Sequence, residues 1–227
     1  RLYNTDEFTT LGISAETGVN WRNFLTTGVN YRIDPIEIYD YFEPRVWGRF
    51  YTIQSSHNVG GFISSDYRKT FALDVNTNIR KFNASGRYRF NYRISPRIRF
   101  SDKFSMVYRF ERNAYIEDEG AAIDLDGEGT IINGDIIFGK RDQTTYTNLL
   151  SASYIFTNRM GLTLRVRHYW SKVDYNSFHI LDNEGYLTAS NYAGVDLDGE
   201  SLHNTNFNAF SVDMVYRWVF APGSELS

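Results

Sequence analysis

The sequence predicts an all-β protein, specifically an antiparallel up-and-down transmembrane β-barrel of the outer-membrane type or a contiguous arc of a larger one, with residues 1–227 in one domain. Three observations predict it: long segments alternate polar and apolar residues, aromatic residues are abundant (17 Tyr, 17 Phe and 4 Trp), and short connections alternate with long ones. We therefore expect the cell outer membrane as its location.

The segment 87–101 carries the clearest alternation. Its even positions are apolar, aromatic or proline and its odd positions are polar, five of them arginine. Successive side chains of a strand point to opposite faces. Soluble strands usually have about 5–6 residues and a tilted membrane-spanning strand needs roughly 9–11, so this segment is long enough to span. Alternation alone leaves a soluble, lipocalin-like barrel open, in which the apolar face points inward.

Similar alternation extends over most of the chain and predicts roughly nine or ten strands. Besides 87–101, the expected strands are 11–21, 25–33, 47–54, 60–65, 70–82, 104–116, 144–156, 160–172 and 207–220. Residues 34–46 interrupt the pattern with Pro35 and Pro44, so we expect a folded connector that packs inside the lumen.

The connections after residue 83 alternate in length. Short turns are expected at 101–103 and 157–159, and long polar loops at 117–142 and 173–206. Outer-membrane barrels have this asymmetry, with short periplasmic turns and longer external loops. The 34–46 connector falls on the side of the short turns and does not fit the rule.

Composition excludes several classes of protein. A net charge of −3 argues against a general nucleic-acid binder, and the chain has no run of about 18 apolar residues that would make a transmembrane helix. Nineteen of the 24 basic residues are arginine. Arginine suits a confined polar interior because its planar fork binds carboxylates and stacks on tyrosine.

The polar faces of three strands supply the candidate lumen-lining residues. They are Arg87, Arg89, Arg93, Arg97, Arg99, Arg109, Glu111, Arg165 and Arg167. Such a lumen could select anions. Alternatively, the arginines pair with Glu111, Asp74, Asp213 and Glu16 in a network that supports the wall, and we favour this reading because buried charges persist when they are paired.

Two acidic segments repeat the sequence Asp-Leu-Asp-Gly-Glu. The candidate calcium ligands are Asp124, Asp126 and Glu128 in one and Asp196, Asp198 and Glu200 in the other. Closely spaced carboxylates suit Ca²⁺, but the twelve-residue EF-hand spacing is missing. An acidic loop that turns at Asp-Gly is the favoured interpretation, and we expect no other cofactor.

The sequence predicts no catalytic residues. Its four histidines are scattered, and neither His-Glu-x-x-His nor Gly-x-Ser-x-Gly occurs. His168 is expected on the lipid-facing side near Trp170. A barrel-embedded hydrolase would need His beside Ser or Asp across strands, and we expect the protein not to be an enzyme.

Five blocks along the chain resemble the carboxy-terminal region of the "domain of unknown function 5916" family, large proteins of Bacteroidota. The blocks are FEPRVWGRF at 42–50, SSDYRK at 64–69, IIFGKRD at 136–142, RHYWSK at 167–172 and WVFAPGSEL at 218–226. The resemblance implies an outer-membrane barrel that follows a carbohydrate-binding-like domain and continues with more strands. It carries over no catalytic residues.

These observations lead us to expect an integral outer-membrane barrel that is an accessory or structural component of an outer-membrane assembly, linked to surface glycan handling through the resemblance. The expected partners are outer-membrane lipid and other outer-membrane proteins, with no nucleic acid. A solute-passing barrel with an Arg-rich lumen and a barrel-embedded hydrolase are the two alternatives.

Overall fold

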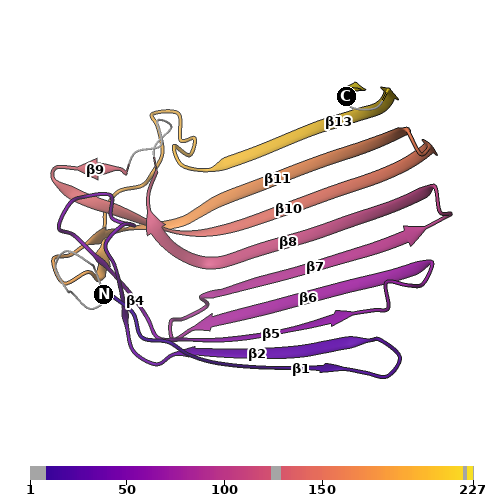
Figure 1. The fold of residues 1–227 in the computed structure, drawn as a ribbon. Coiled ribbons are helices and arrows are strands. Elements are labelled where there is room, and N and C mark those ends of the chain that lie inside the picture. Colours follow the sequence, from indigo (N-terminus) through magenta and orange to yellow (C-terminus); the bar gives the residue numbers. More distant parts are fainter. Residues whose placement is uncertain (1–8, 124–128, 222–223, 227) are drawn as a thin grey trace.

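The protein is built around one large, curved antiparallel sheet (Figure 1). The computed structural model describes residues 9–123, 129–221 and 224–226. Its strands are β1 (Ile13–Asn20), β2 (Thr26–Asp34), β3 (Ile38–Asp40), β4 (Tyr51–Ile53), β5 (Ser56–Ser64), β6 (Phe71–Phe82), β7 (Tyr88–Arg99), β8 (Phe104–Ala121), β9 (Ile131–Ile132), β10 (Asp135–Thr157), β11 (Met160–Leu181), β12 (Leu187–Ala189), β13 (Thr205–Ala221) and β14 (Ser224–Leu226).

The main strands are hydrogen-bonded in the order β1-β2-β5-β6-β7-β8-β10-β11-β13-β14, so each long strand pairs with the next long strand in the chain. β9 and β12 pair with β10 and β11, and β3 and β4 form a separate pair. Within the described residues β1 and β14 do not pair with each other, so the sheet is an open arc. No helix long and apolar enough to cross a membrane occurs in the described parts of the chain.

The register of the strands places apolar residues opposite apolar residues and polar residues opposite polar residues on β6, β7 and β8. Val75, Ile94 and Phe110 lie opposite one another on β6, β7 and β8, and so do Asn76, Arg93 and Glu111. Directly opposed residues of antiparallel strands share a face. We call the side that carries Ile94 the apolar face and the side that carries Arg93 the polar face.

Two aromatic rows cross the apolar face. The row near the short turns joins Phe100, Phe104, Tyr154, Phe156 and Tyr216, with successive ring centroids 4.8–6.4 Å apart. We call it the turn-side row.

The loop-side row joins Tyr92, Phe110, Tyr146 and Trp170, with successive ring centroids 5.3–6.2 Å apart. Tyr146 and Tyr154 belong to β10, and the eight residues from one to the other rise about 26 Å along a strand, or about 20 Å if the strand is tilted by ~40°.

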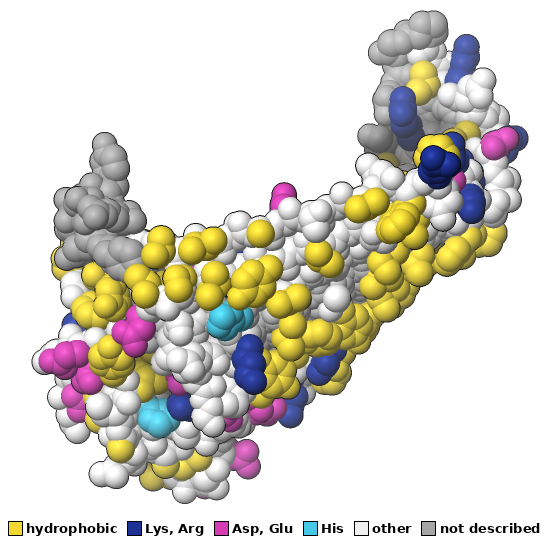
Figure 2. All heavy atoms as spheres, turned by 90° about the horizontal axis from the view of Figure 1, so that it is seen from below, with side chains coloured by type: hydrophobic (Ala, Val, Ile, Leu, Met, Phe, Trp, Pro, Cys, Tyr) yellow, Lys and Arg dark blue, Asp and Glu magenta, His cyan; other side chains and the backbone are white. Residues whose placement is uncertain are grey.

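Much of the apolar face lacks a covering layer. At least half of the side chain surface is exposed at Val29, Val59, Phe71, Phe210, Val212 and Met214. Figure 2 shows hydrophobic side chains gathered along the sheet between its two ends, with acidic side chains mainly at the end that carries the long connections and basic ones at the end with the short turns. A soluble monomer rarely exposes an apolar patch larger than a few hundred Å².

The two long loops are shorter than the expected 117–142 and 173–206. β8 continues to Ala121, β10 begins at Asp135, and β11 continues to Leu181. Opposite charges across strands explain the extension, since Glu119 faces Lys140 and Asp118 faces Arg141 in the β8–β10 register. The acidic composition of 117–142 concealed this pairing.

The segment 47–54, which was expected to be a strand of the main sheet, contributes only the three residues of β4, which pair with β3. One strand, β5, therefore crosses the sheet between the connector and the 65–70 turn. The connector therefore lies at the same end of the sheet as the long loops. Its length agrees with the alternation of short turns and long connections, contrary to the expectation from the sequence.

Candidate functional site

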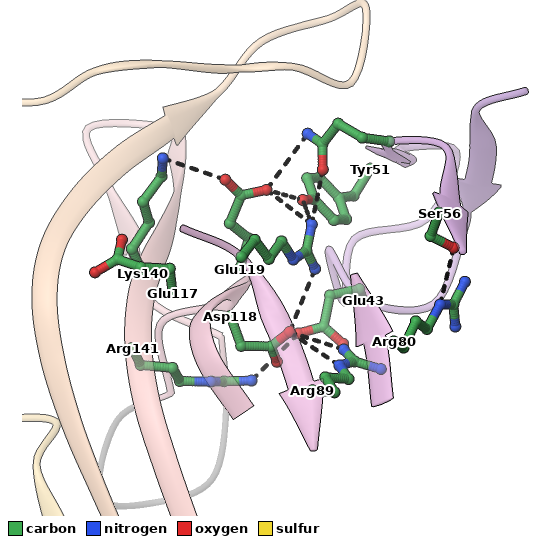
Figure 3. Close-up of polar contacts among 12 residues, drawn as sticks. Glu43, Tyr51, Ser56, Arg80, Arg89, Glu117, Asp118, Glu119, Lys140 and Arg141 are labelled. Carbon is green, nitrogen blue, oxygen red and sulfur yellow. Dashed lines mark hydrogen bonds and ion pairs between the residues drawn. The ribbon is translucent and has the colours of Figure 1, made fainter. Parts of the chain in front are cut away.

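A buried cluster of charged residues joins the connector to the ends of the long strands (Figure 3). At its centre lies Arg87, whose side chain is 2% exposed. Its Nη1 donates to Tyr51 Oη at 2.8 Å, to Gln54 Oε1 at 2.9 Å and to Glu119 Oε2 at 2.9 Å. Tyr51 Oη also donates to Glu119. One guanidinium thus binds both β4 and β8.

The carboxylates of the cluster have further basic partners. Asp118 Oδ1 lies 3.4 Å from Arg87 Nη2 and 2.8 Å from Arg89 Nη2. The second oxygen of Glu119 lies 3.3 Å from Lys140 Nζ on β10. Figure 3 shows Tyr51 from β4 and Lys140 from β10 pointing at Glu119, and Arg89 from β7 pointing at Asp118. The charges are therefore mutually compensated, as buried charges require.

Burial changes the titration of Tyr51 on β4 and of Glu43 on the connector. Desolvation raises the pKa of the Tyr51 hydroxyl well above its ordinary value, despite the opposing effect of Arg87. Desolvation also raises the pKa of Glu43, although the backbone N–H of Ala121 donates to its carboxylate at 3.0 Å. Tyr51 is consequently a neutral hydrogen-bond donor at physiological pH.

Apolar packing completes the attachment. Tyr51 stacks obliquely against Phe138 at a centroid distance of 5.0 Å, in a buried core with Ala121, Ile136 and Leu181. The Arg49 guanidinium donates to the carbonyl of Leu181 at 2.9 Å. We call residues 35–55, held in this way against β8, β10 and β11, the cap.

A second ion-pair group lies where the cap meets β2, β5 and β6. Asp34, which is 1% exposed, accepts from Arg32 Nη2 at 2.7 Å and from Arg80 Nη2 at 2.8 Å. Ser56 donates to the same carboxylate at 3.2 Å and accepts from Arg80 Nε. This group joins β2, β5 and β6 at the two ends of the cap.

The polar face near the short turns has a different character. Five of its arginines are exposed, and among the described residues no carboxylate oxygen lies within 4.0 Å of the guanidinium nitrogens of these five. They are Arg97, Arg99, Arg109, Arg165 and Arg167. Arg97 lies over the ring of Tyr67, 4.9 Å from its centroid. We call this region the turn-end half of the polar face and the region around Arg87 the loop-end half.

The expected ion-pair network therefore forms in one half of the polar face. Glu111 pairs with Arg93 at 2.8 Å. Asp74 instead accepts hydrogen bonds from Ser64 and Tyr67, and Asp213 lies opposite Arg165 in register without an ion pair between them among the described contacts. The main partners of Arg87 and Arg89 are Asp118 and Glu119, which lie on β8 and not in the loop that the sequence predicts there.

The acidic segment 196–200 forms a tight turn. Asp196 Oδ1 accepts from the backbone N–H groups of Asp198 and Glu200, each at 2.9 Å, and Gly199 has a φ of +84°. No group of three or more metal-ligating side chains with suitable spacing is found in the described chain. The other candidate ligands, Asp124, Asp126 and Glu128, lie outside the described residues.

Two histidines make cross-strand or cross-loop bonds on opposite parts of the molecule. His203 is buried, with Nδ1 2.8 Å from the carbonyl oxygen of Ile123 and Nε2 2.8 Å from Tyr192 Oη. His168, beside Trp170 on the apolar face, contacts Asn148 and Asn208, each at 3.2 Å. Both histidines link neighbouring segments of the fold.

Sequence reasoning missed the acids and the tyrosine of the cluster. The run from Glu117 to Gly120 has no alternation and resembles a solvated loop, and Tyr51 lies in a short segment that pairs locally. One signal was available: Lys140 and Arg141 stand in the next segment as basic counterparts to Asp118 and Glu119. Opposite charges at matching places in consecutive segments are typical of paired strands.

Comparison with known families settles the relationship of the chain. A family model described as "Domain of unknown function (DUF5916)" matches residues 1–227. The chain belongs to the DUF5916 family. A search of curated proteins and a search of solved structures each gave no significant match. The cap, the loop-end cluster and the arginines of the turn-end half are thus features of a DUF5916 chain.

Proposed function

We propose that this chain forms the wall, or a contiguous part of the wall, of a transmembrane β-barrel in the outer membrane, with its apolar face toward lipid. The observation that carries the proposal is the pair of aromatic rows on that face. They flank an exposed apolar band about 20 Å high, and outer-membrane barrels have aromatic girdles on either side of a band of ~25 Å. We also propose, from the family resemblance, that the chain belongs to the barrel region of a larger Bacteroidota protein.

The open edges of the arc support a larger barrel. The outer edge of β1, and much of that of β13, have no strand partner among the described residues. Unpaired backbone groups are very unfavourable in hydrocarbon, which is why spanning sheets close. Further strands, from whatever source, would satisfy these edges.

We propose that the barrel acts as an accessory or structural component of an outer-membrane assembly. The cap supports this role, because it lies on the polar-face side at the loop end and is fixed there by the contacts of Arg87 with Tyr51 and of Arg49 with Leu181. A segment fixed so firmly at the lumen mouth would obstruct passage. The link to surface glycan handling rests on the family resemblance alone.

Solute passage is the second candidate. The observation that favours it is the turn-end half of the polar face, where five exposed arginines have no carboxylate partner among the described residues. Cationic rings select anions in membrane pores.

Membrane insertion can be tested directly. The protein should show β-type circular dichroism in detergent and run with different gel mobility before and after heating. A protein that stays monodisperse in buffer without detergent would overturn the membrane proposal and support a soluble β-sheet protein.

Conductance distinguishes the two roles. An accessory barrel obstructed by the cap should give no stable single-channel current in a planar bilayer. A steady anion-selective current from the intact protein would reject the accessory role and establish passage.

A further inference from the structure

A depression opens beside the turn between β7 and β8. It is lined by Arg99, Ser101, Asp102, Lys103, Phe104, Ser105, Ser153 and Ile155. Most of its lining residues carry a hydroxyl or a charge, in contrast to the depressions on the apolar face, which are lined mainly by aliphatic and threonine side chains. Its position, at the short-turn end, is far along the strands from the loop-end cluster.

Strand register aligns the hydroxyl groups of the depression with its arginine. Arg99 lies opposite Ser105, and Ser105 lies opposite Ser153, so the three side chains form one row across β7, β8 and β10. Among the described residues, the hydroxyls of Ser105 and Ser153 have no protein hydrogen-bond partner. Ser101 Oγ accepts from the backbone N–H groups of Lys103 and Phe104, which leaves its own hydrogen free to donate.

Two cations and one carboxylate line this depression. Arg99, Lys103 and Asp102 are all exposed, and no ion pair joins Asp102 to either cation within the described contacts. Arg97 and Arg165, which stand on the same face toward the middle of the strands, add positive charge nearby. The depression therefore combines net positive charge with hydroxyl donors.

We propose that this depression binds a phosphate group. A phosphate has several acceptor oxygens arranged tetrahedrally and carries up to nearly two negative charges at neutral pH, which suits two separate cations and three hydroxyls. A carboxylate has two oxygens in one plane and would leave part of this donor set unused.

The phosphate could belong to a free solute or to a lipid headgroup. Phe104 lines the depression and also belongs to the turn-side aromatic row, which lies at headgroup depth in the membrane placement proposed above. Because Arg99, Ser105 and Ser153 stand on the polar face, a lipid headgroup would have to reach them over the rim of the wall at the β7–β8 turn. The lipid source rests on that proposed function, whereas recognition of free phosphate does not.

Calorimetric titration with inorganic phosphate, in a phosphate-free maltoside detergent, tests the site. The variant that carries Arg99→Gln and Lys103→Gln should bind phosphate about tenfold more weakly or worse, because each substitution removes a charge-assisted contact. Arg22→Gln, at an exposed position in the β1–β2 turn outside the depression, should bind like the unaltered protein. Acetate should bind more weakly than phosphate.

Reconstitution of the protein into lipid vesicles then identifies the source of the phosphate. If lipid phosphate fills the site, protein in phosphatidylglycerol vesicles should not bind added phosphate, whereas protein in vesicles of a phosphate-free galactolipid should. If the ligand is a free solute, the protein should bind added phosphate in both kinds of vesicle.

Equal phosphate affinity in the double variant and the unaltered protein, or no binding by the unaltered protein in detergent, would overturn the proposal. A protein that binds phosphate through Arg99 and Lys103 yet needs no detergent would refute the membrane function and leave the site intact.

Discussion

The two halves of the polar face use the same residue type in opposite ways. In the loop-end half, Arg87 is 2% exposed and bound by two carboxylates and a tyrosine. In the turn-end half, Arg165 and Arg167 are exposed without a carboxylate partner among the described residues. The same arginine pattern thus serves attachment at one end of the strands and presents free positive charge at the other.

Strand length produces this difference. β8, β10 and β11 extend beyond β7 at the loop end. The extensions bring Asp118 and Glu119 beside Arg87, and Lys140 beside Glu119. At the turn end the polar-face neighbours of the arginines are mainly Ser, Thr and Val, as in the row Arg97, Val107, Ser151 and Arg165. The difference shows that the neighbouring strand, more than the arginine itself, determines the role.

The largest effect is expected at Arg87. Arg87→Met should lower the free energy of unfolding by roughly 3–5 kcal/mol, because it leaves buried Glu119 and Asp118 without their shared partner. Urea titration of the detergent-solubilised protein, followed by tryptophan fluorescence, measures the loss.

Arg167→Met is the matched control in the turn-end half. It should change stability by less than about 0.5 kcal/mol, since it removes an exposed charge that has no carboxylate partner among the described residues. If Arg87→Met and Arg167→Met lowered the free energy of unfolding by similar amounts, the distinction between the loop-end and turn-end halves would be wrong.

A smaller but substantial effect separates the two faces. Leu150→Arg, on the apolar face between the aromatic rows, should cost roughly 2–4 kcal/mol in lipid vesicles. Ser151→Arg, the next residue of β10, adds the same side chain to the polar face and should cost less than about 1 kcal/mol. The outcome that contradicts the account is a larger loss for Ser151→Arg.

Much of the fold could be predicted from the sequence because its signal is local. The alternation in residues such as Val75, Ile94 and Leu164 reflects one strand at a time, and the structure has antiparallel strands at these places. Glu111 was likewise expected to have an arginine partner, and it pairs with Arg93.

The rest depends on pairing between segments, which alternation cannot report. In the extensions of β8 and β10, Glu119 and Asp118 lie opposite Lys140 and Arg141, and Glu119 forms an ion pair with Lys140. Tyr51 acquires its role through contacts with Arg87 and Glu119, which are more than 30 positions away in the sequence. These contacts could not be read from the composition of either partner.

The smallest predicted effect concerns Glu43 at the edge of the loop-end half. Because desolvation raises its folded-state pKa above the ordinary 4.5, its carboxylate destabilises the fold at neutral pH and this penalty disappears as the pH falls toward 4.5. Glu43→Gln should therefore raise stability at pH 7 by less than about 1 kcal/mol, since the side chain is 35% exposed and screened. Urea titrations at pH 7 and pH 4.5 should show the gain only at the higher pH.

The most direct test of the central claim is a spin-label scan of Leu162 to Arg167 on β11 in lipid vesicles. The chain contains no cysteine, so each position can be labelled singly. Labels at 162, 164 and 166 should be relaxed strongly by oxygen, which partitions into lipid, and labels at 163, 165 and 167 by a water-soluble nickel chelate. If the nickel chelate instead relaxed the labels at 162, 164 and 166, or if neither reagent reached them, the apolar face would not be in contact with lipid. The membrane account would then be wrong.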